Sequence, residues 1–246
     1  METTAPAAPV VVGRQLAKRY GLGEAAVNAL RGVSVEIAPA SFTAIMGPSG
    51  SGKSTLMHLL AGLDFATEGE VEIAGTQLRR LDDTELTKLR RDKVGFVFQA
   101  YNLVPVLTAE ENVRLPLTLS GRGDDAGRVD RLLEAVNLVD RRTHRPAELS
   151  GGQQQRVAVA RALASEPAVI FADEPTGNLD SGTSHEILEL LRRAVDEFGQ
   201  AVVMVTHDAG AAAVADRVIF LDDGQVVGDE SGLDAEQILD RMKALA

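Results

Sequence analysis

The 246-residue sequence predicts an α/β fold, with a mixed sheet that contains parallel strands, an antiparallel β layer and an inserted helical subdomain. Short runs that are apolar throughout suit parallel strands buried on both faces, and helix-like periodicity alternates with them. Between residues 99 and 165 helical patterns replace the apolar runs, which indicates the insertion. Several apolar runs end in polar residues, at the sheet edge where open α/β sheets bind ligands.

The individual elements follow from these patterns in chain order. The predicted parallel strands lie at 42–47, 94–99, 168–174 and 201–208, and helices follow at 54–63 and 184–198. Antiparallel strands are expected in the first thirty-odd residues and at 32–38 and 69–78, and an Asp-Gly turn predicts a hairpin over 218–227. Within the insertion, helical patterns at 107–117 and 130–139 are joined by a polar linker at 120–128.

These elements predict a domain organisation. Residues 1–9 read as a disordered tail, 10–98 and 166–230 as an α/β core, 99–165 as the helical subdomain and 231–246 as a C-terminal helix. The N-terminal stretch lacks the basic and apolar regions of a signal peptide, and no run of about 18 apolar residues predicts a membrane span. We therefore expect a cytoplasmic chain whose membrane role, if it has one, goes through a partner.

Composition excludes several classes of function. The net charge is 25 − 36 = −11, whereas nucleic-acid binding requires a basic face, so no nucleic-acid partner is expected. The excess of acidic residues can also be explained simply as a solvated surface. The chain has no cysteine, which excludes disulfides, thiolate zinc sites and cysteine nucleophiles.

One glycine-rich segment follows the first predicted parallel strand. It matches the pattern G-x-x-x-x-G-K-[ST] and comprises Gly47, Pro48, Ser49, Gly50, Ser51, Gly52, Lys53, Ser54 and Thr55. In this P-loop pattern backbone N–H groups surround phosphates, the lysine reaches the outer phosphates and the serine hydroxyl ligates Mg²⁺. The strand before it and the helix after it favour this interpretation over a structural turn, and predict a P-loop NTPase core.

Candidate catalytic groups end two other predicted strands. Asp173 and Glu174 are adjacent at one strand end, which suits a water-mediated Mg²⁺ contact for Asp173 and a general base at Glu174. Without the P-loop, a solvated acidic turn would be a serious alternative. A lone histidine is usually structural, but His207 ends a strand at the same predicted edge, and we interpret it as a phosphate contact. Tyr20 either stacks on a nucleobase or packs, and the pattern leaves both open.

A second anion cradle is predicted at the start of a helix. Ser150, Gly151, Gly152 and Gln153 open an apolar helical pattern, and helix N-termini favour anions. If the helical subdomain lies away from Lys53, one chain cannot surround one nucleotide with both cradles. Two chains placed head to tail can do so, and this two-fold arrangement closes on itself. We therefore predict a homodimer that forms on nucleotide binding.

Together the motifs resemble the ATPase domains of ABC transporters, over about residues 10–228. "GPSGSGKST", Gln99, "LSGGQ", "VIFADE", "NLD" and His207 occur in the order of that family. The resemblance implies ATP and Mg²⁺ as cofactors, an adenine-stacking Tyr20, a Mg²⁺- and water-sensing Gln99, a catalytic Glu174 and a switch histidine at His207. It also implies that Asp180 crosses the dimer interface and that the ATP of the other subunit is bound by Ser150, Gly151, Gly152 and Gln153. The residues implied for metal binding are Ser54, Gln99 and Asp173.

The segments "LTAEENVRLPL" and "DEPTGNLD" resemble the LolD/MacB-like branch of this family. This resemblance implies an FtsX-like permease as partner, which would hold the chain at the inner face of the membrane. The leading hypothesis is the ATPase subunit of an exporter of lipoproteins, drugs or peptides. The alternative is a cell-division-type signalling ATPase that transports nothing. A soluble relative acting in DNA repair or translation fits poorly, because the chain has no cysteine, no heptad run and a charge of −11.

Overall fold

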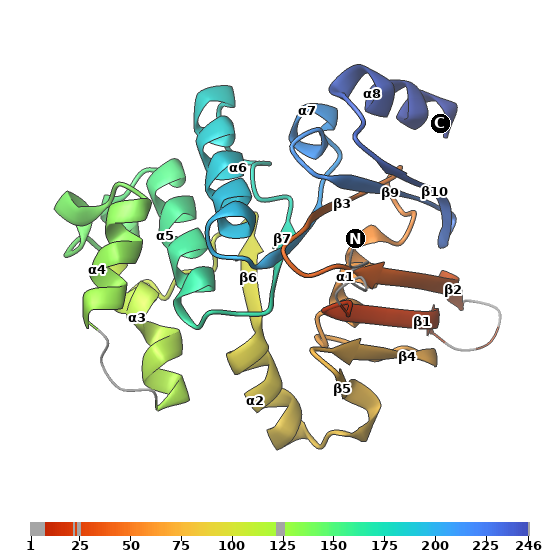
Figure 1. The fold of residues 1–246 in the computed structure, drawn as a ribbon, viewed down its shortest axis with the longest axis horizontal. Coiled ribbons are helices and arrows are strands. Elements are labelled where there is room, and N and C mark those ends of the chain that lie inside the picture. The colour runs from red at the N-terminus through yellow and green to blue at the C-terminus, as the bar shows by residue number, and fades with distance from the viewer. Residues whose placement is uncertain (1–7, 22, 24–25, 122–125, 246) are drawn as a thin grey trace, which may run out of the picture.

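The computed structural model describes residues 8–21, 23, 26–121 and 126–245, whose elements form two sheets flanked by helices (Figure 1). The larger sheet has six strands in the order β10-β9-β3-β8-β7-β6. Their bounds are β3 Phe42–Met46, β6 Val94–Phe98, β7 Val169–Asp173, β8 Ala201–Val205, β9 Arg217–Asp222 and β10 Gln225–Ser231.

The strand pairing in this sheet confirms the predicted mixture of parallel strands with one antiparallel hairpin. Strands β6, β7, β8, β3 and β9 pair in parallel, and β10 returns antiparallel to β9. In this register Asp173 lies opposite Phe98 on one side and Val205 on the other. The residues that follow these strands therefore share one edge of the sheet, as parallel pairing requires.

The smaller sheet confirms the predicted antiparallel layer. It has four strands in the order β2-β1-β4-β5, which are β1 Val11–Tyr20, β2 Val27–Ile37, β4 Glu68–Ile73 and β5 Thr76–Gln77. Buried residues alternate along the second half of β2 at Val33, Val35 and Ile37, as expected for a strand with one solvated face. These side chains share a hydrophobic cluster with α1, so the layer fixes the helix that follows the P-loop.

Helices cover the remaining faces. They are α1 Lys53–Leu60, α2 Asp83–Lys93, α3 Ala109–Ser120, α4 Ala126–Ala135, α5 Gly151–Ala164, α6 Ser181–Asp196, α7 Ala209–Ala212 and α8 Ala235–Ala244, with short 3₁₀ turns at Leu78–Arg80, Val139–Arg141 and Pro146–Glu148. Helix α2 was not among the predicted elements, because its burial is limited to Leu86 and it lacks a clear apolar stripe. A capping box between Asp82 and Glu85 starts it.

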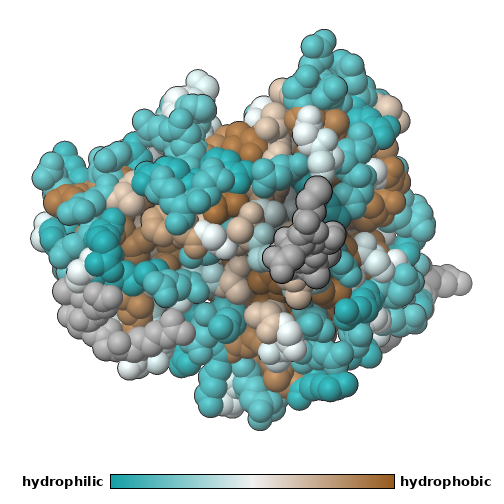
Figure 2. Space-filling model, in the orientation of Figure 1, coloured by the Kyte–Doolittle hydropathy of each residue, from teal (hydrophilic) through white to brown (hydrophobic). Residues whose placement is uncertain are grey.

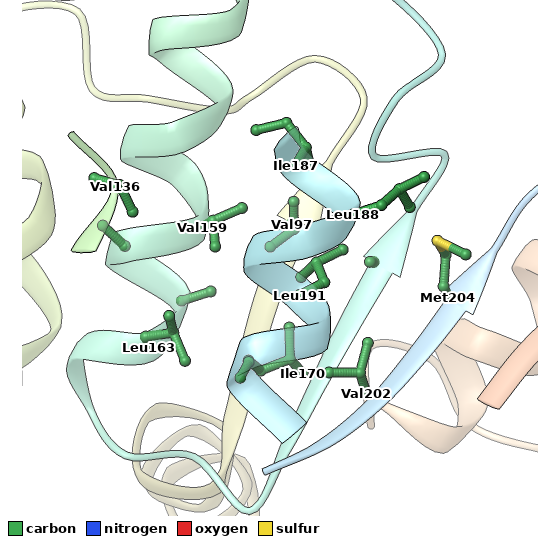
Figure 3. Close-up of a cluster of buried hydrophobic side chains, with 14 of the residues drawn as sticks. Val97, Val136, Val159, Leu163, Ile170, Ile187, Leu188, Leu191, Val202 and Met204 are labelled. Atoms are coloured by element: carbon green, nitrogen blue, oxygen red, sulfur yellow. The ribbon is translucent and has the colours of Figure 1, made fainter. Parts of the chain in front are cut away.

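The hydrophobic core joins the helical insertion to the sheet. Figure 3 shows Val159 and Leu163 of α5 facing Ile187 and Leu191 of α6, with Ile170 of β7 beside them. All five side chains belong to one buried cluster and are at most 4% exposed. Because α5 and α6 share this cluster with the sheet, the N-terminal ends of both helices have fixed positions relative to the strand ends.

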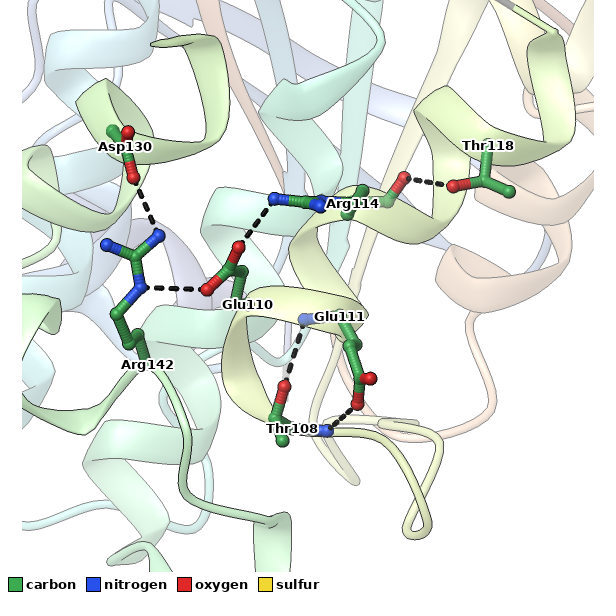
Figure 4. Close-up of polar contacts among 7 residues, drawn as sticks. All are labelled: Thr108, Glu110, Glu111, Arg114, Thr118, Asp130 and Arg142. Atoms are coloured by element: carbon green, nitrogen blue, oxygen red, sulfur yellow. Dashed lines mark hydrogen bonds and ion pairs between the residues drawn. The ribbon is translucent and has the colours of Figure 1, made fainter. Parts of the chain in front are cut away.

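Charged side chains tie the helices of the insertion together (Figure 4). Arg142 donates from Nε to Glu110 of α3 and from Nη2 to Asp130 of α4, both at 2.7 Å. Arg114 also bonds Glu110 from one turn further along α3. A capping box between Thr108 and Glu111 starts that helix. One carboxylate and one guanidinium thus connect three chain segments at the surface.

The space-filling view shows hydrophilic side chains over most of this face, with apolar side chains gathered in the hollows between its lobes (Figure 2). Within the described residues, no helix is long and apolar enough to cross a bilayer. Of the predicted tail, residues 1–7 lie outside the described part, as do residues 122–125 of the predicted linker. The domain boundaries given above stay a prediction.

Candidate functional site

The P-loop joins the buried strand β3 to α1, and its backbone requires glycine at two positions. Gly47 has φ +151° and Gly52 has φ +101°. A Cβ atom at Gly47 would lie 2.0 Å from the Leu221 carbonyl oxygen, and one at Gly52 would lie 2.4 Å from that of Ala29. A larger residue cannot occupy either position without moving the neighbouring backbone, so the loop closes tightly around its own N–H groups.

Two features of the loop suit a phosphate group. Gly52 caps α1 without any side-chain hydrogen bond, so the first N–H groups of the helix remain available to an anion. The Ser51 hydroxyl is buried and has no hydrogen-bond partner among the described residues. A buried polar group without a partner is unfavourable. A phosphate oxygen in the loop would satisfy these donors.

Lys53 supplies the cation of the loop. Its ammonium group donates to the carbonyl oxygens of Gly47 at 2.9 Å and Pro48 at 2.8 Å, so the side chain folds back over the loop. Burial lowers the pKa of Lys53, and the carboxylates of Glu174 and Asp173 oppose that shift. The lysine therefore lies within electrostatic reach of both acidic residues, which the sequence placed at the same sheet edge.

The acidic pair and His207 come together at the ends of β7 and β8. Glu174 Oε1 lies 2.8 Å from His207 Nδ1, and the backbone of Glu174 has the left-handed φ of +47°. Burial raises the pKa of Asp173; the Glu174 charge adds to the rise, and His58 and Lys53 oppose it. A cavity of about 490 Å³ lies beside Glu174 and His207 and continues along the start of α6.

Gln99 follows β6 and is held by the loop after Glu174. Its Nε2 donates to Asn178 Oδ1 at 3.1 Å, and Asn178 Nδ2 donates back to the Gln99 carbonyl at 3.1 Å. Gly177 permits this approach, since a Cβ there would lie 2.8 Å from Gln99 Nε2. The amide of Gln99 is therefore paired with a neighbour of the acidic residues in the free chain.

The second cradle lies elsewhere. Ser150 caps α5: its Oγ accepts from Gln153 N at 3.2 Å, and Gln153 Oε1 accepts from Ser150 N at 2.9 Å. Figure 1 places α5 on the far side of α6 and β7 from α1. The Ser150–Gln153 segment lines neither the cavity beside Lys53 nor the one beside Glu174. The structure of one chain thus keeps the two cradles apart.

Asp180 has a role within its own chain. It caps α6, where Oδ1 accepts from Thr183 N at 3.0 Å and Oδ2 accepts from the Thr183 hydroxyl at 2.7 Å. Hydrogen bonds from Thr183 lower the pKa of Asp180. The sequence assigned Asp180 only to the dimer interface. The capping pattern, Asp followed three residues later by a threonine N–H donor, would have indicated the helix start.

A second cavity, of about 520 Å³, lies against the P-loop. Gly50, Gly52, Lys53, Ser54 and Thr55 form one wall, and the opposite wall comes from Val27, Asn28, Arg31 and Asp223. Arg31 and Asp223 form an ion pair at 2.7 Å within that second wall. Sequence reasoning missed this second wall, because β2 and the β9–β10 turn reach the P-loop only through the packing of the two sheets. Tyr20 ends β1 on the same antiparallel sheet and is 43% exposed.

The three histidines other than His207 make contacts of their own. His144 lies 3.2 Å from an Arg141 guanidinium nitrogen, and His185 lies 3.1 Å from Glu189 one helical turn away. His58, in the last turn of α1, acts on Asp173 through its charge.

A P-loop after β3, with an acidic pair after a parallel strand of the same sheet, defines a P-loop nucleoside triphosphatase. The family model described as "ABC transporter" matches residues 30–177, and the chain belongs to this family as an ATP-binding cassette ATPase. It is 50% identical over 223 residues to an uncharacterised ABC transporter ATP-binding protein of Methanocaldococcus jannaschii, MJ0796, covering 88% of this chain and 95% of that protein.

Other relatives support the same branch. The chain is 47% identical over 223 residues to a macrolide export ATP-binding/permease protein MacB of Marinobacter nauticus, covering 90% of this chain but 34% of that protein. A solved dimeric structure of MJ0796 in a post-hydrolysis state, bound to ADP and Pi, superposes with a TM-score of 0.83 at 48% identity and covers 91% of this chain and 99% of that one. The predicted resemblance to the LolD/MacB-like branch is confirmed.

Proposed function

We propose that two copies of this chain bind Mg-ATP head to tail, hydrolyse it, and drive a separate FtsX-like permease that exports or extrudes lipoproteins, drugs or peptides. The chain would lie at the inner face of the membrane, attached through that permease. The observation that carries the dimer is the separation of the two anion cradles, with Lys53 and Ser150 on opposite sides of α6. The dimeric, ADP- and Pi-bound structure of a relative supports a dimer of this chain.

In the proposed site each group of this chain has a defined task. The P-loop N–H groups and Lys53 hold the phosphates, and Tyr20 carries the adenine. Glu174 accepts the proton of the attacking water, a role that its carboxylate suits because it lines the cavity at the strand end. His207, bonded to Glu174 through Nδ1, keeps Nε2 free to contact the terminal phosphate.

The residues proposed for the metal fit a hard cation. Ser54, Gln99 and Asp173 offer hydroxyl, amide and carboxylate oxygens, the ligand types that Mg²⁺ prefers. Among the described residues, no cluster of three or more His, Cys, Asp or Glu could hold a metal ion by itself. Mg²⁺ commonly binds through few carboxylates and substrate phosphates. When bound, it neutralises phosphate charge.

The free energy of hydrogen bonds to the terminal phosphate is large enough for this phosphate to control the opening and closing of the dimer. Converting a mostly open dimer to a mostly closed one requires about 5.5 kcal/mol. Hydrogen bonds to charged groups contribute about 1.5–3 kcal/mol each, so two such bonds at each of two sites supply about 6 kcal/mol or more. In the proposed dimer these bonds come from Ser150 and the N–H groups of Gly151 and Gly152. ADP lacks the terminal phosphate, so hydrolysis reopens the dimer.

An apolar groove on the surface supports the proposal of a permease partner. It has a volume of about 400 Å³ and lies between β6 and α3, next to the loop that begins at Gln99. Its apolar lining comes from Leu63, Val94, Phe96, Phe98, Leu115, Pro116 and Leu119. Leu63 and Leu119 of this lining are 43% and 63% exposed, so the groove presents apolar side chains to solvent. A permease segment seated here would contact both the sheet and the helical insertion.

A cell-division-type signalling ATPase would use the same site and the same groove. Reconstituting the chain with its neighbouring permease in vesicles separates the two functions. Movement of a substrate that depends on ATP supports export, and ATP turnover without movement supports signalling.

Mixing two inactive variants tests the head-to-tail site. Lys53→Ala removes the P-loop cation and Ser150→Arg blocks the opposite cradle, so each homodimer has two defective sites. A mixed dimer has one intact site, whereas neither homodimer has any. An equal mixture should therefore recover ATPase activity, up to about a quarter of the wild-type rate, since half the dimers carry one working site of two. A mixture that stays inactive, or a wild-type specific rate independent of protein concentration, would refute the shared site.

A further inference from the structure

Tyr20 is held in a fixed orientation by two side chains outside the sites described so far. Its phenolic hydroxyl donates to Asp64 Oδ2 at 3.0 Å. Lys18 donates to the other oxygen of Asp64 at 2.7 Å and to the Phe65 carbonyl oxygen at 2.7 Å. The ammonium of Lys18 also lies over the Tyr20 ring, 4.9 Å from its centroid. One carboxylate therefore fixes both the edge of the ring and the cation that covers one of its faces.

The carboxylate of Asp64 is itself well fixed. Its Oδ1 accepts from the backbone N–H of Phe65 at 2.7 Å in addition to Lys18. Burial alone would raise the pKa of Asp64, but hydrogen bonds from Lys18, Phe65 and Tyr20 outweigh burial and lower it. The Lys18 side chain is only 12% exposed, so its ammonium is held in place rather than free in solvent.

This arrangement leaves one ring face available. Lys18 covers one face, and the phenolic hydroxyl is occupied by Asp64, yet the residue is still 43% exposed. Burial and Asp64 raise the pKa of the Tyr20 phenol, and Thr55 in the first turn of α1 lowers it. Asp64 follows the other end of α1, which closes at Leu60. Through Asp64 the ring is therefore tied to the segment that follows the P-loop helix.

We propose that Asp64 and Lys18 are positioning residues that hold the Tyr20 ring as a nucleobase platform with one open face, at a fixed place relative to the P-loop. This inference rests on the proposed function, because the base must belong to a nucleotide whose phosphates the P-loop holds. Stacking requires a flat ring in the correct plane. A ring already fixed in the free chain loses no rotamer freedom on binding, which strengthens binding without adding any contact.

The expected effect is specific to the base. Ordering one side chain on binding corresponds to a loss of affinity of about three- to tenfold. Asp64→Ala should therefore raise the Kd for ATP by that factor and leave the Kd for inorganic tripolyphosphate, which has no base, unchanged. Lys18→Met should act in the same direction with a smaller factor, because Asp64 still holds the phenol. Asp140→Ala, at an exposed acidic position on the helical insertion, serves as the matched control.

A double-mutant cycle makes the test decisive. In a Tyr20→Ala background, Asp64→Ala should have no further effect on ATP binding, since there is no ring left to position. Titration calorimetry on the full chain measures each Kd, and thermal melting shows that each variant is folded. The inference is overturned if Asp64→Ala weakens tripolyphosphate equally, if its effect persists without Tyr20, or if both Asp64→Ala and Lys18→Met leave ATP binding within a factor of two.

Lys53→Ala separates this inference from the proposed function. If Lys53→Ala weakens both ATP and tripolyphosphate while the Asp64 and Lys18 variants change neither, the P-loop assignment stands and only the platform fails. If Lys53→Ala changes neither ligand, the nucleotide site itself is wrong and the platform falls with it.

Discussion

Asn112 secures the loop between Gln99 and α3, and its replacement by alanine should destabilise the chain measurably. The side chain is fully buried, and its Oδ1 accepts from Val104 N at 2.8 Å. Its amide group has two hydrogens but faces three carbonyl oxygens, those of Val104 and Leu107 at 3.2 Å and Thr108 at 3.0 Å. One side chain thus replaces the regular backbone pairing that this loop lacks.

The magnitude follows from which groups lose their last partner. After Asn112→Ala, the Val104 carbonyl still accepts from Leu107 N, and the Thr108 carbonyl still accepts from the backbone N–H of residue 112. The Val104 N–H and the Leu107 carbonyl keep no partner that the structure records. Each unpaired group costs about 1–3 kcal/mol, and both residues are only half-buried, so we take the low end and expect about 2–3 kcal/mol in total.

Thermal and urea unfolding measure this loss. A destabilisation of that size should lower Tm by about 5–10 °C in a chain of this length. Thr118→Ala is the matched control on the same helix: Thr118 is exposed and makes only a 3.4 Å contact with the Arg114 carbonyl, so little change is expected. A loss below about 1 kcal/mol for Asn112→Ala, or an equal loss for Thr118→Ala, would refute the reasoning.

Three further predictions concern the site. Glu174→Gln should retain ATP binding but lower kcat by about 10²–10⁴-fold and accumulate dimer, as measured by steady-state turnover and gel filtration; normal turnover would remove Glu174 as the base. Gly152→Ala places a Cβ 2.4 Å from Thr183 Cγ2 and should cost about 1–3 kcal/mol in urea unfolding, and Thr183→Ser, which lacks that methyl group, should restore most of it. Asp173→Asn should stabilise the free chain at neutral pH: burial raises the pKa of Asp173, so the ionised form is penalised only when folded, and the gain should shrink as pH falls through the raised pKa. A gain that grows in acid would contradict that sign.

Much of the site could be predicted because its residues are close along the chain or at the ends of buried strands. The P-loop is one continuous segment, and parallel pairing brings Asp173 and the residues after Phe98 and Val205 to one edge whatever the loops do. The apolar runs fix that pairing, since only buried parallel strands suit sequences without polar alternation.

The remainder depended on contacts that no local pattern encodes. Lys18 and Asp64 are 46 residues apart and meet only because the antiparallel sheet packs over α1. Arg31 and Asp223 reach the P-loop cavity from two different sheets. Asn112 reads as an ordinary polar residue in a helical pattern, and its burial is set by the loop that folds over it. Such contacts follow from tertiary packing, which local sequence rules do not contain.

Helix α5 connects the trans cradle to both loops of its own site. Gln155 donates to the Pro175 carbonyl at 2.6 Å, one residue after Glu174. Arg161 donates to the Asn102 carbonyl at 2.6 Å and to the Tyr101 carbonyl at 2.9 Å, in the loop that begins at Gln99. Burial lowers the pKa of Arg161, and breaking these bonds would leave a buried cation with fewer partners. Displacing α5 from either loop would break hydrogen bonds that the structure records. In the proposed dimer, these bonds would connect a phosphate bound at the start of α5 to the loop after Glu174 of the same chain, which would serve the other nucleotide.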